Sequence, residues 1–232
     1  MQEIEFVTKL KEKSIEINDK QLAQFASYYD LLIEYNQKTN LTAITEKKDV
    51  YSKHFFDSLL ILSDCNLYGA VADVGTGAGF PGIPLKIMVP DINLTLIEPT
   101  RKKLDFLRIV VKELKLKNVD FINQRAEDLT KNRRECFDYV VSRAVAHLNI
   151  LSELCLPFVK LEGEFWALKG PNADNEISTS QKAIRILGGQ LIAVHKHNYQ
   201  DQSRSNIQIK KIKETPSQYP RNYGKIKNKP LG

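Results

Sequence analysis

The sequence is poor in the features that mark secreted, metal-binding or membrane-embedded proteins. Its three cysteines, Cys65, Cys136 and Cys155, are too few and too scattered for a disulfide framework or a zinc knuckle. No apolar run approaches the roughly 18 residues that would span a membrane, and there is no repeat or low-complexity tract. We therefore expect a protein without metal or membrane anchor, whose 232 residues can bury one sizeable core.

The first residues also lack the apolar run of a secretory signal, because stretch 1–14 mixes acidic and basic side chains. This predicts a soluble, cytoplasmic protein, which we expect to be a monomer. Positive charge is concentrated at the other end. Of 34 Lys and Arg and 28 Asp and Glu, nine bases and two acids lie in 196–232, so residues 1–195 hold 25 bases and 26 acids. Such clustering is typical of binding to a phosphate backbone, but a solvated, solubilising tail has the same composition.

The spacing of apolar residues predicts helices first and then an alternation of strands and helices. Within 3–62, Asp19 caps a stretch with helical apolar spacing. Strands are predicted at 70–74, 93–98, 118–123, 137–142, 163–169, 190–195 and 206–213, and helices at 82–89, 101–116, 148–159 and 174–187. This order predicts an α/β fold with a mostly parallel seven-stranded sheet covered on both faces. No helix separates the last two strands, so they should form an antiparallel hairpin.

The expected organisation has three parts: a helical segment 1–66 packed on the core, a cofactor-binding core 67–214 and a basic tail 215–232. Trp166 falls in the middle of a strand and is expected in the core. His195 and His197 lie on one face of another strand, where an exposed pair is expected.

The strongest motif is a glycine-rich turn between strand 70–74 and helix 82–89. Glycines at Gly75, Gly77 and Gly79 let the backbone approach a ligand, and the amides of the following helix point at it. Glu98 closes the next strand, where a carboxylate can accept both hydroxyls of a ribose. The motif predicts a nucleoside-containing cofactor at the carboxyl edge of the sheet.

The glycine turn fits two cofactor classes. Residues 77–82 match the dinucleotide fingerprint of nicotinamide-dependent oxidoreductases, and residues 73–79 match the loop of S-adenosylmethionine enzymes. Three features favour S-adenosylmethionine. Asp73, two residues before the first glycine, resembles the acid that faces the cofactor's amino-acid part. The acidic stretch 126–128 follows the third strand, where that class holds the adenine, and the terminal hairpin suits its seven-stranded sheet.

Seven strings along the chain, taken in order, are more specific than the glycine turn alone. They are Asn-Leu-Thr at 40–42, His-Phe-Phe-Asp-Ser at 54–58, the glycine turn at 73–85, Arg-Ala-Glu at 125–127, Ser-Arg-Ala at 142–144, Leu-Lys-Gly at 168–170 and Tyr-Pro-Arg at 219–221. With them the chain resembles, over nearly its whole length, the RsmG (GidB) family of bacterial 16S rRNA guanine-N7 methyltransferases. The resemblance implies a Rossmann-like class I methyltransferase that forms 7-methylguanosine at position 527 of 16S rRNA, in the 530-loop region. It also implies cofactor contacts at Gly75, Phe80, Ala126, Glu127 and Arg143, with Glu98 at the ribose.

The residues are compatible with methylation at guanine N7. That atom carries an in-plane lone pair and loses no proton on attack, so positioned donors suffice and no general base is needed. We assign the catalytic role to Arg143, which can bond the cofactor carboxylate or guanine O6, and to Lys169, which ends the next strand on the same edge. Amino-group methylation would favour a proline-containing turn where 142–145 stands. Cytosine methylation at carbon 5 needs a cysteine nucleophile, but Cys155 lies inside a predicted helix.

The expected partner is 16S rRNA or the small ribosomal subunit. RNA contacts are predicted at Arg101 and Lys102, which open the helix after the second strand, at Lys169, and at Arg221 and Lys225 in the tail. Two alternatives stay open: a non-catalytic RNA-binding protein that has kept the fold, and a methyltransferase for a small molecule or a protein.

Overall fold

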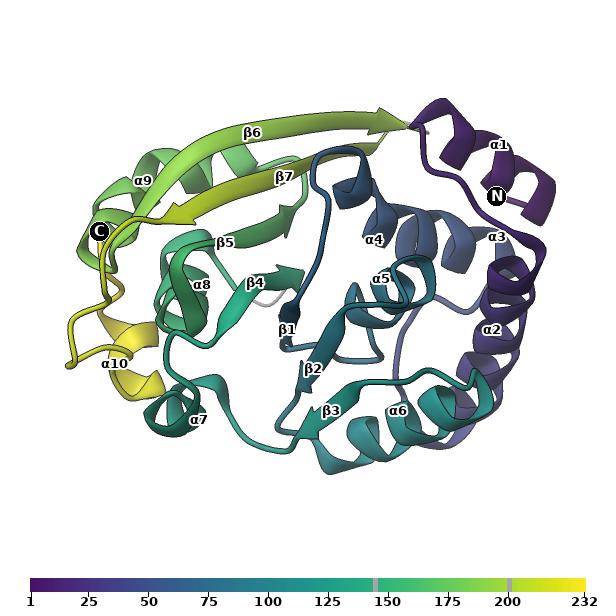
Figure 1. Ribbon diagram of the computed structural model, residues 1–232, viewed down its shortest axis with the longest axis horizontal. Helices are drawn as coiled ribbons and strands as arrows, with labels where there is room; N and C mark the ends of the chain where they lie inside the picture. The colour runs from purple at the N-terminus through teal and green to yellow at the C-terminus, as the bar shows by residue number, and fades with distance from the viewer. Residues whose placement is uncertain (144–145, 200–201) are drawn as a thin grey trace.

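A mixed seven-stranded sheet runs through the centre of the computed structural model, which describes residues 1–143, 146–199 and 202–232 without the side chains of 130–132. The strand order is β3-β2-β1-β4-β5-β7-β6 (Figure 1). The strands are β1 Ala70–Val74, β2 Asn93–Ile97, β3 Val119–Ile122, β4 Phe137–Arg143, β5 Val159–Lys169, β6 Gly189–Tyr199 and β7 Gln202–Lys211. Strands β1 to β5 are parallel, and β7 pairs antiparallel with both β5 and β6. The predicted fold class, with its terminal hairpin, is confirmed.

Helices cover both faces of the sheet (Figure 1). One layer holds α1 Glu3–Glu12, α2 Asp19–Thr39, α3 Lys47–Val50, a π-helix Tyr51–Phe56, α4 Asp57–Leu59, a 3₁₀ helix Leu60–Ser63, α5 Gly82–Met88 and α6 Arg101–Glu113. The other holds α7 Ala126–Arg133, α8 Leu148–Cys155, a 3₁₀ helix Leu156–Phe158, α9 Ala173–Ile186 and α10 Tyr223–Asn228. Successive strand residues alternate between the two apolar clusters, as Phe165 and Trp166 do. Trp166 is fully buried, as predicted.

Several local predictions were wrong. The cap of α2 is Asn18, whose side chain accepts a hydrogen bond from the Gln21 amide, and not Asp19. The helix predicted over 148–159 ends at Cys155, since Pro157 cannot continue it, and β5 then begins at Val159. The short helices α7 and α10 were not predicted.

The two histidines of β6 do not form an exposed pair. His197 is 6% exposed and its Nε2 lies 2.8 Å from Asp64 Oδ2, while the ring of His195 stacks on Trp166. Asp64 directly follows the N-terminal helices. Sequence spacing placed both rings on one face of the strand, but it could not show that these helices cover that face.

The N-terminal helices pack on the glycine turn through an aromatic cluster. Tyr28 of α2 is fully buried and stacks on Phe55, Phe80 and Phe106. Its hydroxyl donates a hydrogen bond of 2.5 Å to the carbonyl of Ala78, in the middle of the turn. This segment therefore shares its core with the sheet, and whether 1–66 is a separate domain stays a prediction.

The C-terminal tail is folded against α7 and α8. Arg134 donates from Nη1 to the Tyr219 carbonyl and from Nη2 to the carbonyls of Thr215 and Pro216. Arg221 donates from Nε and Nη2 to the fully buried carboxylate of Glu153, at 2.8 and 2.6 Å. Because Glu153 has this guanidinium as its counter-ion, the tail is tied to the core by a buried charge.

Removing the Arg221 side chain should destabilise the protein. Arg221→Ala leaves the Glu153 carboxylate buried without its cation. We expect a loss of roughly 3 kcal/mol in the free energy of unfolding, the lower end of the range for a broken buried pair, because Arg221 is partly exposed. Urea denaturation measures it. Lys225→Ala, an exposed cation in the same tail, is the control and should change this free energy by less than about 0.5 kcal/mol. Equal effects of the two variants would contradict the assignment.

Candidate functional site

The glycine turn after β1 has a backbone conformation that glycine adopts most readily. Gly75, Gly77 and Gly79 have φ angles of 73°, 60° and 103°. A Cβ on Gly79 would lie 2.5 Å from the Tyr28 hydroxyl, whereas a Cβ on Gly77 would have the Gly75 carbonyl, at 3.9 Å, as its nearest neighbour. The protein thus packs tightly against the turn at Gly79 and leaves room over Gly77, where a ligand can approach the backbone.

Glu98 follows β2 and flanks the turn. Its two carboxylate oxygens accept hydrogen bonds from the amides of Gly77, at 3.1 Å, and Thr100, at 2.9 Å, and the residue is 5% exposed. An ionised carboxylate offers about four acceptor positions, so both oxygens can accept further bonds. The carboxylate therefore has acceptor positions left, and their use by ribose hydroxyls stays a prediction.

Asp73 is fully buried beneath the turn. Its Oδ2 accepts a hydrogen bond of 2.8 Å from the Gly82 amide, which opens α5. Burial raises the pKa of this carboxyl to about 6, against the opposing effects of Thr76, the Gly82 amide and the charge of Arg143. Ionisation of Asp73 is therefore costly, and a cation bound over the turn would favour it.

The end of β3 brings the remaining predicted cofactor residues to the same edge. The Asn123 side chain donates hydrogen bonds to the carbonyls of Glu98 and Pro99, which ties this end to β2. Ala126 and Glu127 then begin α7, and Ala126 is 8% exposed. The structure thus gathers the predicted residues around the carboxyl ends of β1, β2 and β3, where cofactors of such sheets bind. Their individual contacts with a cofactor stay predictions.

Arg143, the last residue of β4, is bound to the N-terminal helices. Its Nη1 donates to the Asp57 carboxylate at 2.8 Å, to the Ser58 hydroxyl and to two backbone carbonyls of the π-helix. Its guanidinium also lies 5.1 Å from the centre of the Phe80 ring. Most of its donors are therefore used within the protein, and its side chain is 12% exposed. It joins the sheet edge, the glycine turn and the helices.

His54 lies between Arg143 and the turn. Its ring stacks on Phe80 at 4.4 Å, Nδ1 lies 3.2 Å from Arg143 Nη2, and Nε2 lies 2.9 Å from the Thr42 hydroxyl. Burial, and then the charge of Arg143, lowers the pKa of His54 to about 3. Arginine can only donate, so Nδ1 must accept and Nε2 must carry the hydrogen. His54 is thus a neutral structural ring, with both nitrogens engaged.

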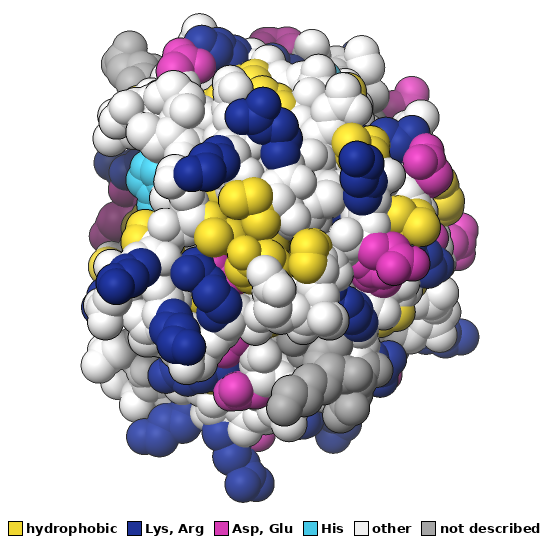
Figure 2. All heavy atoms as spheres, turned by 90° about the vertical axis from the view of Figure 1, so that its left-hand side faces the viewer, with side chains coloured by type: hydrophobic (Ala, Val, Ile, Leu, Met, Phe, Trp, Pro, Cys, Tyr) yellow, Lys and Arg dark blue, Asp and Glu magenta, His cyan; other side chains and the backbone are white. Residues whose placement is uncertain are grey.

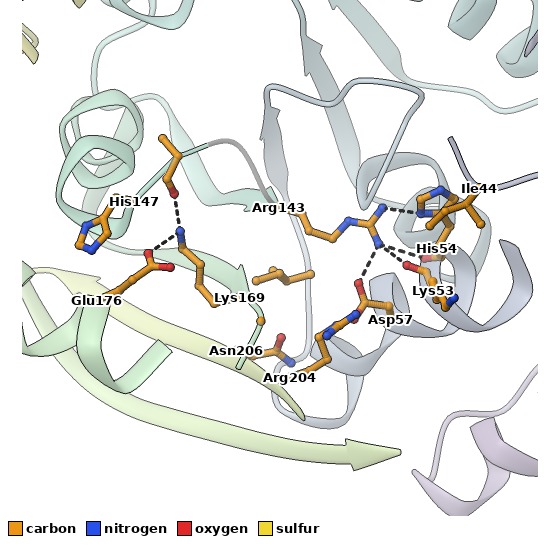
Figure 3. A pocket seen from close by; sticks show the side chains of 13 residues that line it. Ile44, Lys53, His54, Asp57, Arg143, His147, Lys169, Glu176, Arg204 and Asn206 are labelled. Atoms are coloured by element: carbon orange, nitrogen blue, oxygen red, sulfur yellow. Dashed lines mark hydrogen bonds and ion pairs between the residues drawn. The ribbon is translucent and has the colours of Figure 1, made fainter. Parts of the chain in front are cut away.

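A pocket of about 580 Å³ opens beside this cluster. Figure 3 shows its walls: the N-terminal helices with His54 and Asp57, the end of β4 with Arg143, and side chains of β5, β7 and α9. The lining residues are Ile44, Lys53, His54, Asp57, Arg143, Ala146, His147, Leu168, Lys169, Gly170, Glu176, Arg204 and Asn206. Four of them are Lys or Arg and two are acidic, so the pocket suits an electron-rich ligand.

Lys169 lies across the pocket from Arg143. Its ammonium bonds the Ala146 carbonyl and lies 2.7 Å from Glu176 Oε2. The same Glu176 oxygen accepts a hydrogen bond of 2.8 Å from the Leu148 amide. An ammonium has three donors, so among the described residues these two bonds leave one donor for the pocket. The structure therefore brings the two predicted catalytic residues to one cavity; their roles stay predictions.

Sequence reasoning missed Asp57 and Arg204. Arg204 of β7 donates from Nε to Asp57 Oδ1 at 2.7 Å, while Arg143 binds Oδ2 of the same carboxylate. Asp57 stands in one of the recognised strings, and that position was the only available signal. Arg204 was counted only among the basic residues of the C-terminal region, since nothing in the sequence shows that β7 forms a pocket wall.

The predicted RNA-binding residues are distributed around the carboxyl edge and the tail. Arg101, whose side chain is 85% exposed, and the exposed Lys102 open α6 next to Glu98. Lys225 is exposed on α10, and Lys169 lies in the pocket. Arg221 is instead turned toward Glu153, so its guanidinium is less available to RNA. For each of these residues, a role in RNA binding stays a prediction.

Two expected absences can be stated only for the described part of the chain. Within residues 1–143, 146–199 and 202–232, no three His, Cys, Asp or Glu side chains are grouped so that they could hold a metal ion. In the same ranges no helix has the length and apolar character needed to cross a membrane.

Comparison with known proteins identifies relatives of nearly full length. The family model of GidB, described as rRNA small subunit methyltransferase G, matches residues 21–205. The ribosomal RNA small subunit methyltransferase G of Alkaliphilus oremlandii is 50% identical over 224 residues, with 94% of each chain covered. The protein of that name from Bacillus subtilis is 45% identical over 233 residues, with 98% of each chain covered.

Solved structures agree on the fold alone. M. jannaschii TYW2, in complex with AdoMet, has a TM-score of 0.57 at 18% identity over 73% of this chain and 80% of its own. A precorrin-6y C5,15-methyltransferase from Geobacter metallireducens has a TM-score of 0.53 at 16% identity over 67% of this chain and 87% of its own.

The raised pKa of Asp73 predicts a pH-dependent stability. Its folded pKa, about 6, lies above the value of 3.8 in an unfolded chain. The group therefore stabilises the fold at low pH, and this contribution is lost as the pH rises through 6. Asp73→Asn cannot ionise, so its free energy of unfolding relative to the unsubstituted protein should increase by about 1–2 kcal/mol from pH 5 to pH 8.

Urea denaturation at the two pH values measures this difference. Asp120→Asn, which removes an exposed carboxylate from β3, is the matched control and should show no such increase. A difference for Asp73→Asn that is the same at both pH values would contradict the raised pKa.

Proposed function

Because the chain belongs to the rRNA small subunit methyltransferase G family, we propose that it methylates the RNA of the small ribosomal subunit with S-adenosylmethionine. The product is 7-methylguanosine at position 527 of 16S rRNA. One observation carries this proposal: a pocket rich in positive donors opens beside the glycine turn, with Arg143 and His54 lining it and also contacting Phe80 of the turn.

The residues around the glycine turn fit the cofactor. S-adenosylmethionine supplies a methyl group on a positively charged sulfur. The space over Gly77 admits a ligand close to the backbone, and the Glu98 carboxylate can accept ribose hydroxyls. A cation near Asp73 would stabilise the ionised form of its carboxyl group, and the cofactor carries two cationic groups, an ammonium and a sulfonium. The chain's part is to hold the methyl group in line with the pocket.

The pocket orients the base and takes no proton from it. Guanine N7 attacks with a lone pair in the ring plane, and neighbouring O6 accepts hydrogen bonds. Lys169 and Arg204 present positive donors to such an acceptor. His54 cannot serve as a base, because its one lone pair, on Nδ1, already accepts from Arg143 and its low pKa makes it a poor proton acceptor. This set of groups suits an acceptor that needs no deprotonation.

Other methyl acceptors fit less well. Cys155 is fully buried in α8, so it cannot attack a cytosine. The segment 142–145 contains no proline turn to accept the hydrogens of an amino group; residues 144–145 of this segment lie outside those described. A protein or small-molecule substrate would leave unused the positive charge of residues 196–232. We also propose that the protein acts in the cytoplasm, where ribosomal RNA is found, and as a monomer.

The rate of methyl transfer should be nearly independent of pH. With saturating RNA and cofactor, kcat should change little between about pH 6.5 and 9, because no required base titrates there. Lys169→Arg keeps a positive donor and should retain part of the activity. Lys169→Ala should lose about 100-fold through misplacement of the base. Single-turnover transfer of labelled methyl to deproteinised 16S rRNA measures these rates.

His147→Ala is the control for a hidden base, since His147 is the exposed imidazole of the pocket. Its pH profile should keep its shape. A tenfold rise in rate per pH unit that disappears in this variant would overturn the N7 assignment.

The tail should contribute charge to RNA binding. Lys225→Gln removes an exposed cation, and should weaken RNA binding and reduce the slope of log K against log salt by about one. Filter binding at several salt concentrations measures both quantities. Affinity for S-adenosylmethionine, measured by calorimetry, should not change. An equal loss of both affinities would show that Lys225 acts through the fold.

A further inference from the structure

An exposed arginine lies over the ring of an exposed tyrosine between α7 and α10. The guanidinium carbon of Arg125 lies 5.6 Å from the centre of the Tyr223 ring. Tyr223 is 38% exposed, and Arg125 is exposed as well. Nothing in the function described so far uses this pair, although Arg125 directly precedes Ala126 at the predicted adenine side of the cofactor site.

The backbone that carries Tyr223 is firmly anchored. Asn222 caps α10, with its side chain accepting a hydrogen bond of 2.9 Å from the Lys225 amide. Ile226 is fully buried in the core cluster under α8, and Arg221 is bound to Glu153. A partly exposed aromatic ring held on such a support has little conformational entropy left to lose on binding.

A second exposed cation lies beside the ring. Lys227 is one helical turn from Tyr223, so the two side chains lie on the same side of α10, and Lys227 is exposed. Figure 2 shows the side of the molecule on which the C-terminal residues lie, with many Lys and Arg side chains around a central apolar group. Figure 1 shows α10 next to α7, whose first residues follow the carboxyl end of β3.

We propose that Arg125, Tyr223 and Lys227 form a stacking platform for an unpaired nucleobase of the RNA substrate. The proposal rests on the proposed function and adds a second contact on the RNA, outside the pocket. Unpaired bases stack on tyrosine rings and arginine planes, and an adjacent lysine can neutralise the phosphate of the same nucleotide.

Charge selects RNA as the occupant. Arg125 and Lys227 place two positive charges beside one ring, which would repel a second copy of the same surface. A protein partner would need an acidic patch of its own, and the one partner that the proposed function supplies is a polyanion with exposed bases.

Binding to unpaired and paired RNA tests the platform. The probes are a fluorescein-labelled adenylate 12-mer and an RNA duplex of equal length, measured by anisotropy. Tyr223→Ala should weaken binding of the unpaired probe by about ten-fold, within the range for one stacked base, and should leave the duplex unaffected. Tyr223→Phe should bind like the unsubstituted protein, because stacking does not need the hydroxyl. The slope of log K against log salt should be unchanged in both Tyr223 variants. In Lys227→Gln this slope should be smaller by about one.

Tyr68→Ala is the matched control. Tyr68 is 66% exposed and lies just before β1, at the amino ends of the parallel strands. Its removal should not alter binding of either probe. Three outcomes would each overturn the platform: Tyr223→Ala loses affinity equally for both probes, Tyr223→Ala loses no affinity, or Tyr223→Phe loses as much affinity as Tyr223→Ala. If the unsubstituted protein methylates 16S rRNA while one of these outcomes holds, the platform alone fails. If it does not methylate 16S rRNA, the proposed function fails.

Discussion

Two guanidinium groups share one buried carboxylate, and the geometry of the pocket depends on this contact. Asp57 binds Arg143 at 2.8 Å and Arg204 at 2.7 Å, and 8% of its side chain is exposed. The three residues come from the N-terminal helices, β4 and β7. The two guanidinium groups would repel each other without the carboxylate between them. The carboxylate in turn would be costly to bury without these two cations. The helices and the hairpin are thereby fixed against the carboxyl edge of the sheet, where they form two of the walls of the cavity.

The sequence predicted those parts of the molecule that are encoded locally. Strands appear as short apolar runs that alternate with helical stretches, and the glycine turn must have its residue types in one short stretch, so both could be read directly. The order of the strings at 54–58, 142–144 and 168–170 indicated the family but not why His54, Arg143 and Lys169 meet. That reason is tertiary: parallel strands bring their carboxyl ends together, and the helices before β1 fold back over them.

The remaining features depend on contacts between distant residues, which spacing cannot show. Asp57 and Arg204 are 147 residues apart, and Arg221 is 68 residues from Glu153. The composition of the tail, polar and rich in glycine and proline, is typical of a loop and does not show where the tail packs. Ile226 is its single fully buried apolar side chain, and the Arg221 ion pair to α8 and the hydrogen bonds from Arg134 add to its anchoring. His197 was predicted to be exposed because its partner, Asp64, lies 133 residues earlier, and spacing cannot show such a contact.

The site also separates two kinds of positive charge. Arg143 and Arg204 are held by Asp57, and most of the Arg143 donors are used inside the protein, so that side chain can orient a ligand only in one fixed direction. Lys225, Lys227 and Arg101 are exposed on short, well-supported helices, where they can follow a phosphate backbone but cannot select a base. A rigid interior with few free donors suits a reaction whose barrier is lowered mainly by alignment, while exposed cations suit the proposed contact with a large polyanion. Because the two sets lie on different elements, changes in the tail can alter how the RNA is held without altering how the methyl group is aligned.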